Sequence, residues 1–142
     1  MDRFYIGLFM KVANILIIQN GKILLLHSNK HKIPRVEPPG GRVELGESSE
    51  ECALREAKEE LDIDVKILDF FGKFYSISEN GQKIDIYTFL GKIEKGEPKI
   101  MEPEGFPDFG WYFFEDLLKF KEKGSLAPNL VDGLDKIKEL LN

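Results

Sequence analysis

The sequence predicts a mixed α/β fold, in which helices cover both faces of one mixed central sheet. Two Asn-Gly pairs, at residues 20–21 and 80–81, each lie between two apolar, β-branched runs. This is the usual sequence pattern of a β-hairpin. The hairpins alternate with helical patterns along the chain, and such interleaving favours one sheet with helices packed on it.

The first hairpin is expected at Val12–Ile18 and Lys22–His27. Residues 28–39 are polar and basic and contain three prolines, so we expect a loop there. Gly40-Gly41 follows, and glycine allows tight backbone geometry that other residues resist. The apolar pair in residues 43–45 then indicates a short extended piece.

A helix is predicted from about Ser48 to Leu61. Ser48 and Glu51 form the S-x-x-E pattern of a capping box, which satisfies free backbone N–H groups at a helix start. Ala53, Ala57 and Leu61 recur at helical spacing. We therefore expect them to form the buried stripe of this helix, with the glutamates on a different face.

The second half of the chain predicts further strands and helices. Strands are expected at 65–77 and 83–93, then a proline-containing loop at 96–108, an aromatic strand at 109–114 and a short helix at 115–120. The last segment predicts one amphipathic helix from the helical spacing of its apolar residues, which are Leu130, Leu134, Ile137 and Leu141.

Composition limits the classes of function. A chain of 142 residues is the size of one domain, so residues 1–142 are expected to form a single domain. The net charge of -5 argues against binding a nucleic-acid polymer through its phosphates. The single cysteine, Cys52, suits a reducing, cytoplasmic compartment. No apolar run reaches the roughly 18–20 residues of a membrane span, and the apolar residues 1–19 are interpreted as strands rather than a signal peptide.

Three carboxylates of the middle helix indicate a cation site. Glu56, Glu59 and Glu60 lie three and four residues apart, which places them on roughly one helical face, where like charges repel. A hard divalent cation such as Mg²⁺, which prefers oxygen ligands and accompanies phosphates, relieves that repulsion. Arg55, four residues from both Glu51 and Glu59, is placed to fix carboxylate rotamers. The alternative is an ordinary surface salt bridge.

The segment from Gly41 to Ile63 resembles the signature of the Nudix hydrolase family. The matching positions are Gly41, Glu47, Arg55, Glu56, Ala57, Glu59, Glu60 and Ile63. Asp62 departs from the pattern, because the family usually has glycine there. That position is expected to be left-handed, just past the helix end. Aspartate tolerates this conformation better than most residues, so we expect a small stability cost and intact chemistry.

The resemblance implies a Nudix-type α/β/α sandwich, a single Nudix hydrolase domain at 1–142, and cleavage of a diphosphate linkage in a nucleotide. Water attacks a phosphorus atom, and Mg²⁺ or Mn²⁺ bridges the phosphate oxygens. The implied metal ligands are the side chains of Glu56, Glu59 and Glu60 and the carbonyl of Gly40, with Glu47 and Arg55 orienting them. The general base is not assigned, and it can also lie outside the signature.

Two later segments resemble MutT-type members of the family. Glu104 lies in an E-G-x-P loop ahead of Trp111, and this resemblance makes it a candidate metal ligand or base, with Glu102 as its rival. The alternative is an exposed loop glutamate. Pro128-Asn129 resembles the segment whose asparagine binds the nucleobase, since an amide offers both donor and acceptor. The alternative is that Asn129 caps the last helix.

Other positions concern substrate choice. His27 stands where MutT-type members commonly have a basic residue, and Pro38 stands where they often have an aromatic one. His27, Arg35 and Asn129 are the candidate substrate-binding residues. The loop before the signature is basic, which suits outlying phosphates or a solvated surface; its cations are Lys30, His31, Lys32 and Arg35.

A group of aromatic residues suits either base stacking or core packing, and core packing is favoured. The group consists of Phe70, Phe71, Phe74 and Tyr75.

The favoured function is Mg²⁺-dependent conversion of a (deoxy)nucleoside triphosphate to a monophosphate and pyrophosphate. The first alternative is cleavage of ADP-ribose or another nucleoside diphosphate sugar. The second is a non-catalytic sensor with the same fold, although sensors tend to lose signature carboxylates and all are present here. The expected partner is a small nucleotide, with no nucleic-acid polymer and no membrane. Dimers are common in the family, so the resemblance also allows a homodimer.

Overall fold

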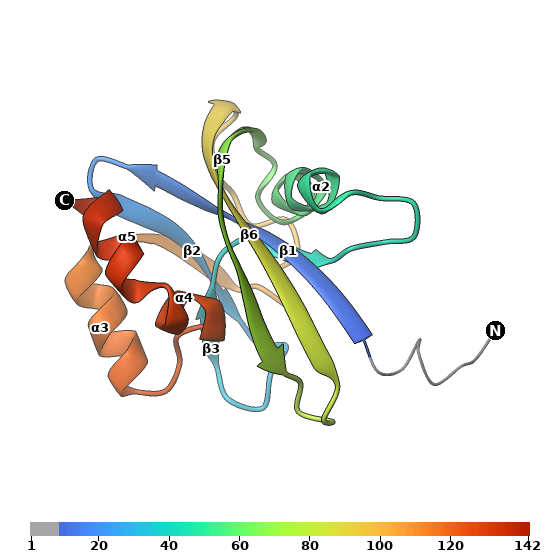
Figure 1. Ribbon diagram of the computed structural model, residues 1–142. Coiled ribbons are helices and arrows are strands. Elements are labelled where there is room, and N and C mark those ends of the chain that lie inside the picture. Colours follow the sequence, from blue (N-terminus) through green and yellow to red (C-terminus); the bar gives the residue numbers. More distant parts are fainter. Residues whose placement is uncertain (1–8) are drawn as a thin grey trace.

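The computed structural model describes residues 9–142 and shows a mixed sheet between two layers of helices (Figure 1). The strand order is β3-β2-β1-β6-β5, with β4 also paired to β1 and β7 also paired to β2. The strands are β1 (Phe9–Gln19), β2 (Lys22–Ser28), β3 (Arg35–Glu37), β4 (Gly40–Arg42), β5 (Asp64–Ile77), β6 (Lys83–Lys95) and β7 (Asp108–Tyr112). The helices are α2 (Ser49–Leu61), α3 (Phe114–Glu122), α4 (Pro128–Asp132) and α5 (Leu134–Leu141). The predicted mixed α/β fold is confirmed.

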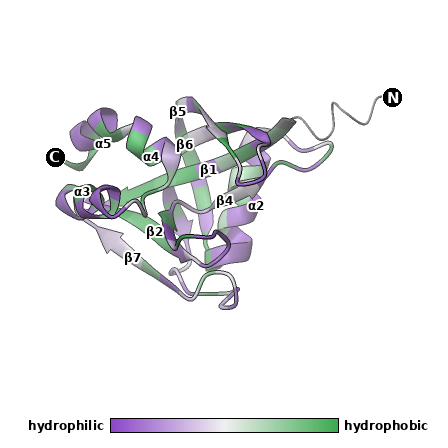
Figure 2. Ribbon diagram, turned by 90° about the horizontal axis from the view of Figure 1, so that it is seen from below, coloured by the Kyte–Doolittle hydropathy of each residue, from purple (hydrophilic) through white to green (hydrophobic). Residues whose placement is uncertain are grey.

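Helix α2 lies on one face of the sheet, and α3, α4 and α5 lie on the other (Figure 1). Under α2, the predicted stripe of Ala53, Ala57 and Leu61 is fully buried against apolar side chains of β1 and β2. On the other face, Leu130 and Ile137 pack on the opposite side of the same strands. Apolar residues follow β1 and β2 through the middle of the molecule (Figure 2). Burying each large apolar side chain contributes about 1.5–3 kcal/mol.

Both predicted hairpins are confirmed. At the first turn Asn20 has φ 53° and Gly21 has φ 73°, and Gln19 pairs with Lys22 across it. Two successive positive φ angles are the mark of the type I′ turn that Asn-Gly favours. Strand β6 also runs parallel to β1, while β2 and β4 run antiparallel to it, so the sheet is mixed.

The predicted start and end of α2 are also confirmed. Ser48 is the N-cap, and its side chain and that of Glu51 form the reciprocal bonds of a capping box. Asp62 ends the helix in the left-handed conformation, with φ 57° and ψ 41°. Lys58 and Lys99 each lie 3.4 Å from the Asp62 carboxylate and lower its pKa. These ion pairs accompany aspartate at the position where the signature has glycine.

Two expectations before α2 were wrong. Residues 35–37 form β3 inside the expected loop, because β2 leaves an edge to which they bond and the side chain of Val36 is buried. The extended piece is Gly40–Arg42, paired with β1, rather than the 43–45 segment. Gly40 allows this close pairing, since a Cβ there would lie 2.3 Å from the Cβ of Asn14.

The single C-terminal helix was also a wrong expectation. Gly133 separates α4 from α5, and a Cβ at this position would lie 2.9 Å from the ring of Phe71. The four predicted apolar residues are nevertheless all buried, so the spacing identified the inward face correctly. Within residues 9–142, none of the helices has the length and apolarity needed to cross a membrane.

Candidate active site

A cavity of about 390 Å³ lies where α2, β1, β4 and α4 meet. Glu56 and Glu60 line one side of it, and Asn14 and Asn129 line another. Its rim carries the basic side chains of Lys30, His31, Arg35 and Arg42. The fold therefore brings residues from both ends of the chain together around one hollow with an acidic side and a basic rim.

Arg55 ties the signature carboxylates together. Its Nε lies 2.6 Å from Glu47 Oε2, and its Nη1 lies 2.8 Å from Glu56 Oε1 and 3.1 Å from Glu59 Oε2. Its Nη2 donates to Glu47 Oε1 and to the carbonyl of Arg42. The Arg55 guanidinium lowers the pKa of Glu47 to about 2. This fork fixes the carboxylate rotamers, as expected for an orienting residue.

Glu60 is a buried carboxyl group, with 1% of its surface exposed. Its Oε1 accepts a hydrogen bond of 3.0 Å from the backbone N–H of Gly40. Burial raises the pKa of Glu60 well above its ordinary value, and the Glu56 carboxyl beside it raises this pKa further. A cation bound beside Glu60 would favour the ionised form of this buried carboxyl group.

The chemistry of these groups fits a divalent metal ion. Glu56 and Glu60 present hard oxygen donors to the cavity, and Gly41 leaves room beside them, since a Cβ there would lie 2.6 Å from the Glu56 carboxyl carbon. Within residues 9–142, no three acidic, imidazole or thiol side chains form a ready-made metal cluster. Glu59 instead lies about half exposed on Arg55. Glu56 and Glu60 therefore form the core of the candidate site.

The structure does not bring Glu104 to this cavity. Glu104 is exposed, and the carbonyl of Glu102 closes a turn by accepting from the N–H of Phe106. The residue that the loop supplies to the cavity wall is Phe106, which is 2% exposed and has Lys30 Nζ 4.2 Å from its ring centre. The assignment of Glu104 as ligand or base stays a prediction.

Asn129 belongs to a buried polar cluster that sequence reasoning missed. Its Nδ2 donates to Thr88 Oγ1 at 3.0 Å and to Asn14 Oδ1 at 3.3 Å. The N-cap of α4 is Ala127, so the alternative role of Asn129 as a helix cap is wrong. The available signal was a polar residue, Asn14, within the apolar run of β1.

His27 lies away from the carboxylates. Its Nε2 is 2.5 Å from the hydroxyl of Tyr112, and it lines a different cavity of about 500 Å³ beside Phe120 of α3. Arg35 lines both cavities. The predicted substrate-binding role therefore has geometric support for Arg35 and Asn129, whereas His27 would need a ligand in the second cavity.

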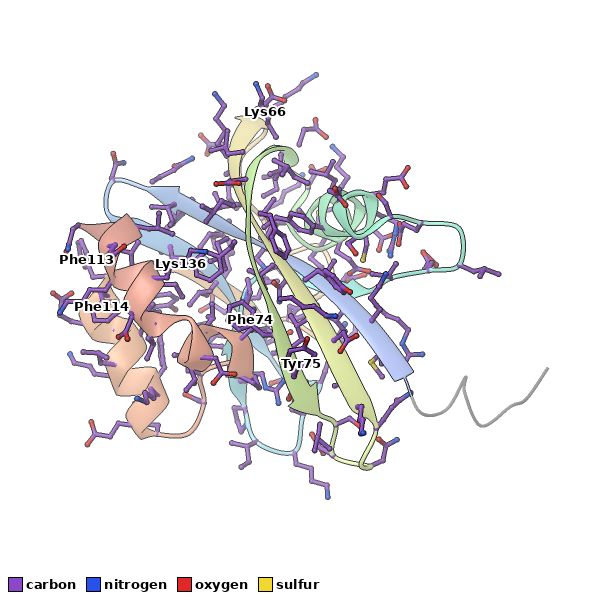
Figure 3. The ribbon with its side chains drawn as sticks, viewed as in Figure 1. Lys66, Phe74, Tyr75, Phe113, Phe114 and Lys136 are labelled. Atoms are coloured by element: carbon purple, nitrogen blue, oxygen red, sulfur yellow. The ribbon has the colours of Figure 1, made fainter. Side chains whose placement is uncertain are left out.

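The four aromatic residues of β5 do not line the candidate site. Phe71 and Phe74 pack in the core beside the C-terminal helices, as favoured from the sequence. Phe70 and Tyr75 are exposed instead. Figure 3 shows Phe74 near α4 and Tyr75 on the outer part of β5.

The raised pKa of Glu60 predicts a pH-dependent stability of the metal-free protein. Unfolded Glu60 loses its proton near the ordinary value of 4.5, whereas folded Glu60 keeps it to a higher pH. Above that ordinary pKa the folded state binds the extra proton, so its contribution to stability falls as pH rises, by at most about 1.4 kcal/mol per pH unit. Urea unfolding in EDTA between about pH 5 and pH 8 should show this slope, and Glu60→Gln should remove it. Equal slopes for both proteins would contradict the burial of a neutral carboxyl.

A model of the NUDIX domain matches residues 8–132. The chain belongs to the Nudix family. Members of this family are hydrolases that act on pyrophosphate bonds of nucleotides, and they generally use divalent metal ions. This agrees with the carboxylate side of the cavity, which lies on the signature helix.

Relatives and solved structures agree with this assignment. The chain is 32% identical over 130 residues to the NAD-capped RNA hydrolase NudC of Mannheimia succiniciproducens, covering 87% of this chain and 47% of that protein. It thus spans about half the length of the curated relatives it matches. A MutT NUDIX hydrolase from Burkholderia pseudomallei superposes with a TM-score of 0.71 at 26% identity, over 75% of this chain and 84% of that one. A NUDIX hydrolase from Nitrosomonas europaea shares the fold, with a TM-score of 0.78 at 20% identity over 92% and 88% of the two chains.

Proposed function

We propose that the cavity at Glu56 and Glu60 is the active site, and that it hydrolyses a diphosphate linkage in a nucleotide with the help of Mg²⁺, or Mn²⁺. The observation that carries this proposal is the carboxyl pair facing the cavity, held by Arg55 and by the N–H of Gly40. A buried carboxyl group such as Glu60 is costly to ionise unless a cation lies beside it. Its position beside a basic rim suits a metal-bound phosphate.

Each part of the cavity has a proposed role. Glu56, Glu59 and Glu60 would hold the ion, and a bound ion would supply positive charge to the phosphate oxygens. Arg55 and Glu47 keep those carboxylates in position. The rim cations bind the phosphate oxygens that the ion does not reach. One of the glutamates accepts the proton of the attacking water, and Glu104 remains the candidate from outside the signature helix.

The proposed substrate class is a nucleoside diphosphate linked to a second group. A nucleoside triphosphate, favoured from the sequence, receives no support from the relatives, whose name refers to NAD-capped RNA. That name favours cleavage of a dinucleotide as the reaction to test first. ADP-ribose is the second substrate to test. A panel of NAD, ADP-ribose and the deoxynucleoside triphosphates, with products separated by ion exchange, distinguishes these reactions. Tight binding without any product would favour the non-catalytic sensor.

The Asn14–Thr88–Asn129 cluster is proposed to bind the nucleobase. Asn129 donates to its two neighbours, so its Oδ1 and the Nδ2 of Asn14 remain for a ligand edge. Asn14→Ala should raise KM about tenfold with little change in kcat, because one ligand contact is lost and Asn129 loses its orienting partner. The exposed Asn29→Ala serves as the control. Steady-state kinetics with an unchanged KM for Asn14→Ala would exclude this role.

A further inference from the structure

A second hollow, which we call the distal groove, lies directly beside the cavity at Glu56 and Glu60. Its volume is about 370 Å³, close to the 390 Å³ of the cavity itself. The two share a common wall, formed by Met10, Lys30, His31, Arg35, Arg42, Ser76 and Ile84. Beyond this wall the groove continues along the turn between β5 and β6, at residues 77–82. The two hollows are therefore neighbours that share one wall.

The wall between the two hollows carries uncompensated positive charge. Among the described residues, Lys30, Arg35 and Arg42 have no carboxylate within 4.0 Å, whereas His31 lies 3.0 Å from Glu37. Free cations at a junction of two hollows suit phosphate groups that pass from one hollow to the other.

The carboxyl pair lies next to this junction. Gly41 is packed against the Glu56 carboxyl group, and the next residue, Arg42, lines both hollows. A diphosphate cleaved at Glu56 and Glu60 would lie close to this junction, so that one of its two substituents would reach the distal groove. A triphosphate would leave the distal groove unfilled, because its leaving group is only pyrophosphate.

The far wall of the groove carries several polar side chains next to Ile77 and Glu79. Gln82 is half-buried, and its backbone N–H donates to Ser78 Oγ at 2.9 Å. Within residues 9–142, the side-chain amide of Gln82 makes no hydrogen bond, so its donors and acceptor are available to a ligand. Ser76 and Asn80 add further polar groups along the groove. Such a wall suits a sugar or a base rather than an apolar group.

We infer that the distal groove binds the second nucleotide of a substrate in which two nucleotides are joined by a diphosphate, and that Gln82 and Arg42 select for it. The inference rests on the proposed function, since it places the cleaved linkage at Glu56 and Glu60. Water adds its oxygen to one phosphorus, the anhydride P–O bond breaks, and the water proton passes through the base to solvent. Two nucleoside monophosphates result. The substrate is either a free dinucleotide or the same dinucleotide at the 5′ end of an RNA strand.

The test compares a whole substrate with its half. Isothermal titration calorimetry with Ca²⁺ in place of Mg²⁺ measures binding of NAD and of AMP to the wild type, Gln82→Ala and Gln82→Glu. We expect NAD to bind the wild type at least about tenfold more tightly than AMP, and both variants to weaken NAD about fivefold or more while AMP is unchanged. Asn29→Ala, in the separate cavity that His27 lines, should change the affinity for neither NAD nor AMP. Equal affinities for NAD and AMP, or equal effects of the variants on both ligands, would overturn the inference.

Two further measurements distinguish the source of the dinucleotide and separate the groove from the reaction. An NAD-capped oligoribonucleotide that binds more tightly than NAD identifies the RNA end as the source of the dinucleotide, and equal or weaker binding identifies the free compound. Product formation is measured in parallel with Mg²⁺. If NAD binds as expected but gives no products, the proposed reaction fails while the groove stands. If NAD is cleaved and Gln82→Glu keeps the wild-type KM, the groove assignment fails while the reaction stands.

Discussion

Glu60→Gln is expected to lower kcat by about three orders of magnitude while the protein remains folded. The amide keeps an oxygen for the N–H of Gly40 but loses the negative charge that a divalent ion requires. Metal ions stabilise phosphoryl transfer by several kcal/mol, and each 1.36 kcal/mol is a factor of about ten in rate. Glu59→Gln is expected to act in the same direction, because its carboxylate bonds Arg55, which also holds Glu56.

The melting temperature of the Glu60→Gln variant separates a loss of catalysis from a loss of folding. In EDTA the variant should melt at the wild-type temperature or above it, since a neutral amide replaces a buried acid whose pKa is raised. Added Mg²⁺ should raise the melting temperature of the wild type only. The matched control is Glu50→Gln, an exposed glutamate in the first turn of the same helix. If both signature variants kept wild-type rates under saturating Mg²⁺, the metal assignment would be wrong.

Arg55→Lys is expected to lower kcat about a hundredfold and to reduce the free energy of unfolding by about 2 kcal/mol. A lysine ammonium is a single point charge and cannot reach Glu47, Glu56 and Glu59 together, as the guanidinium fork does. Charge-assisted hydrogen bonds contribute about 1.5–3 kcal/mol each, and partial exposure of Arg55 reduces this.

The Arg55 prediction is checked by urea unfolding together with the dependence of rate on Mg²⁺ concentration. A positioning role requires that the variant need more Mg²⁺ for half-maximal rate, which a purely structural loss would not produce. Lys58→Arg, on the same helix, changes a cation that pairs with Asp62 and Asp64 and should leave the Mg²⁺ requirement unchanged. An unchanged requirement in Arg55→Lys would contradict the orienting role.

The features that were predictable from sequence are those set by neighbouring residues. The Asn20-Gly21 turn, the capping box of Ser48 and the left-handed Asp62 depend on contacts within a few residues. The stripe at Ala53, Ala57 and Leu61 depends only on helical periodicity. Such signals are complete in a short segment, so they predict the element before its partners are known.

The features that were missed depend on distant partners. Strand β3 exists because the edge of β2 accepts residues 35–37, and β4 exists because Gly40 fits against β1. The break at Gly133 reflects its packing on Phe71 of β5. None of these pairings has a local sequence signal, since each requires the sheet to be assembled first.

The sequence by itself determined the family and the acidic half of the site, because the signature glutamates from Glu47 to Glu60 lie on one turn and one helix whose geometry is local. Only the tertiary structure decided what surrounds them. It joined Asn129 to Asn14 and Thr88, turned His27 to a different cavity, and placed Gln82 and Arg42 along the same groove. The physical reason is that the cavity walls come from segments far apart in the chain, and sheet pairing alone sets their relative positions.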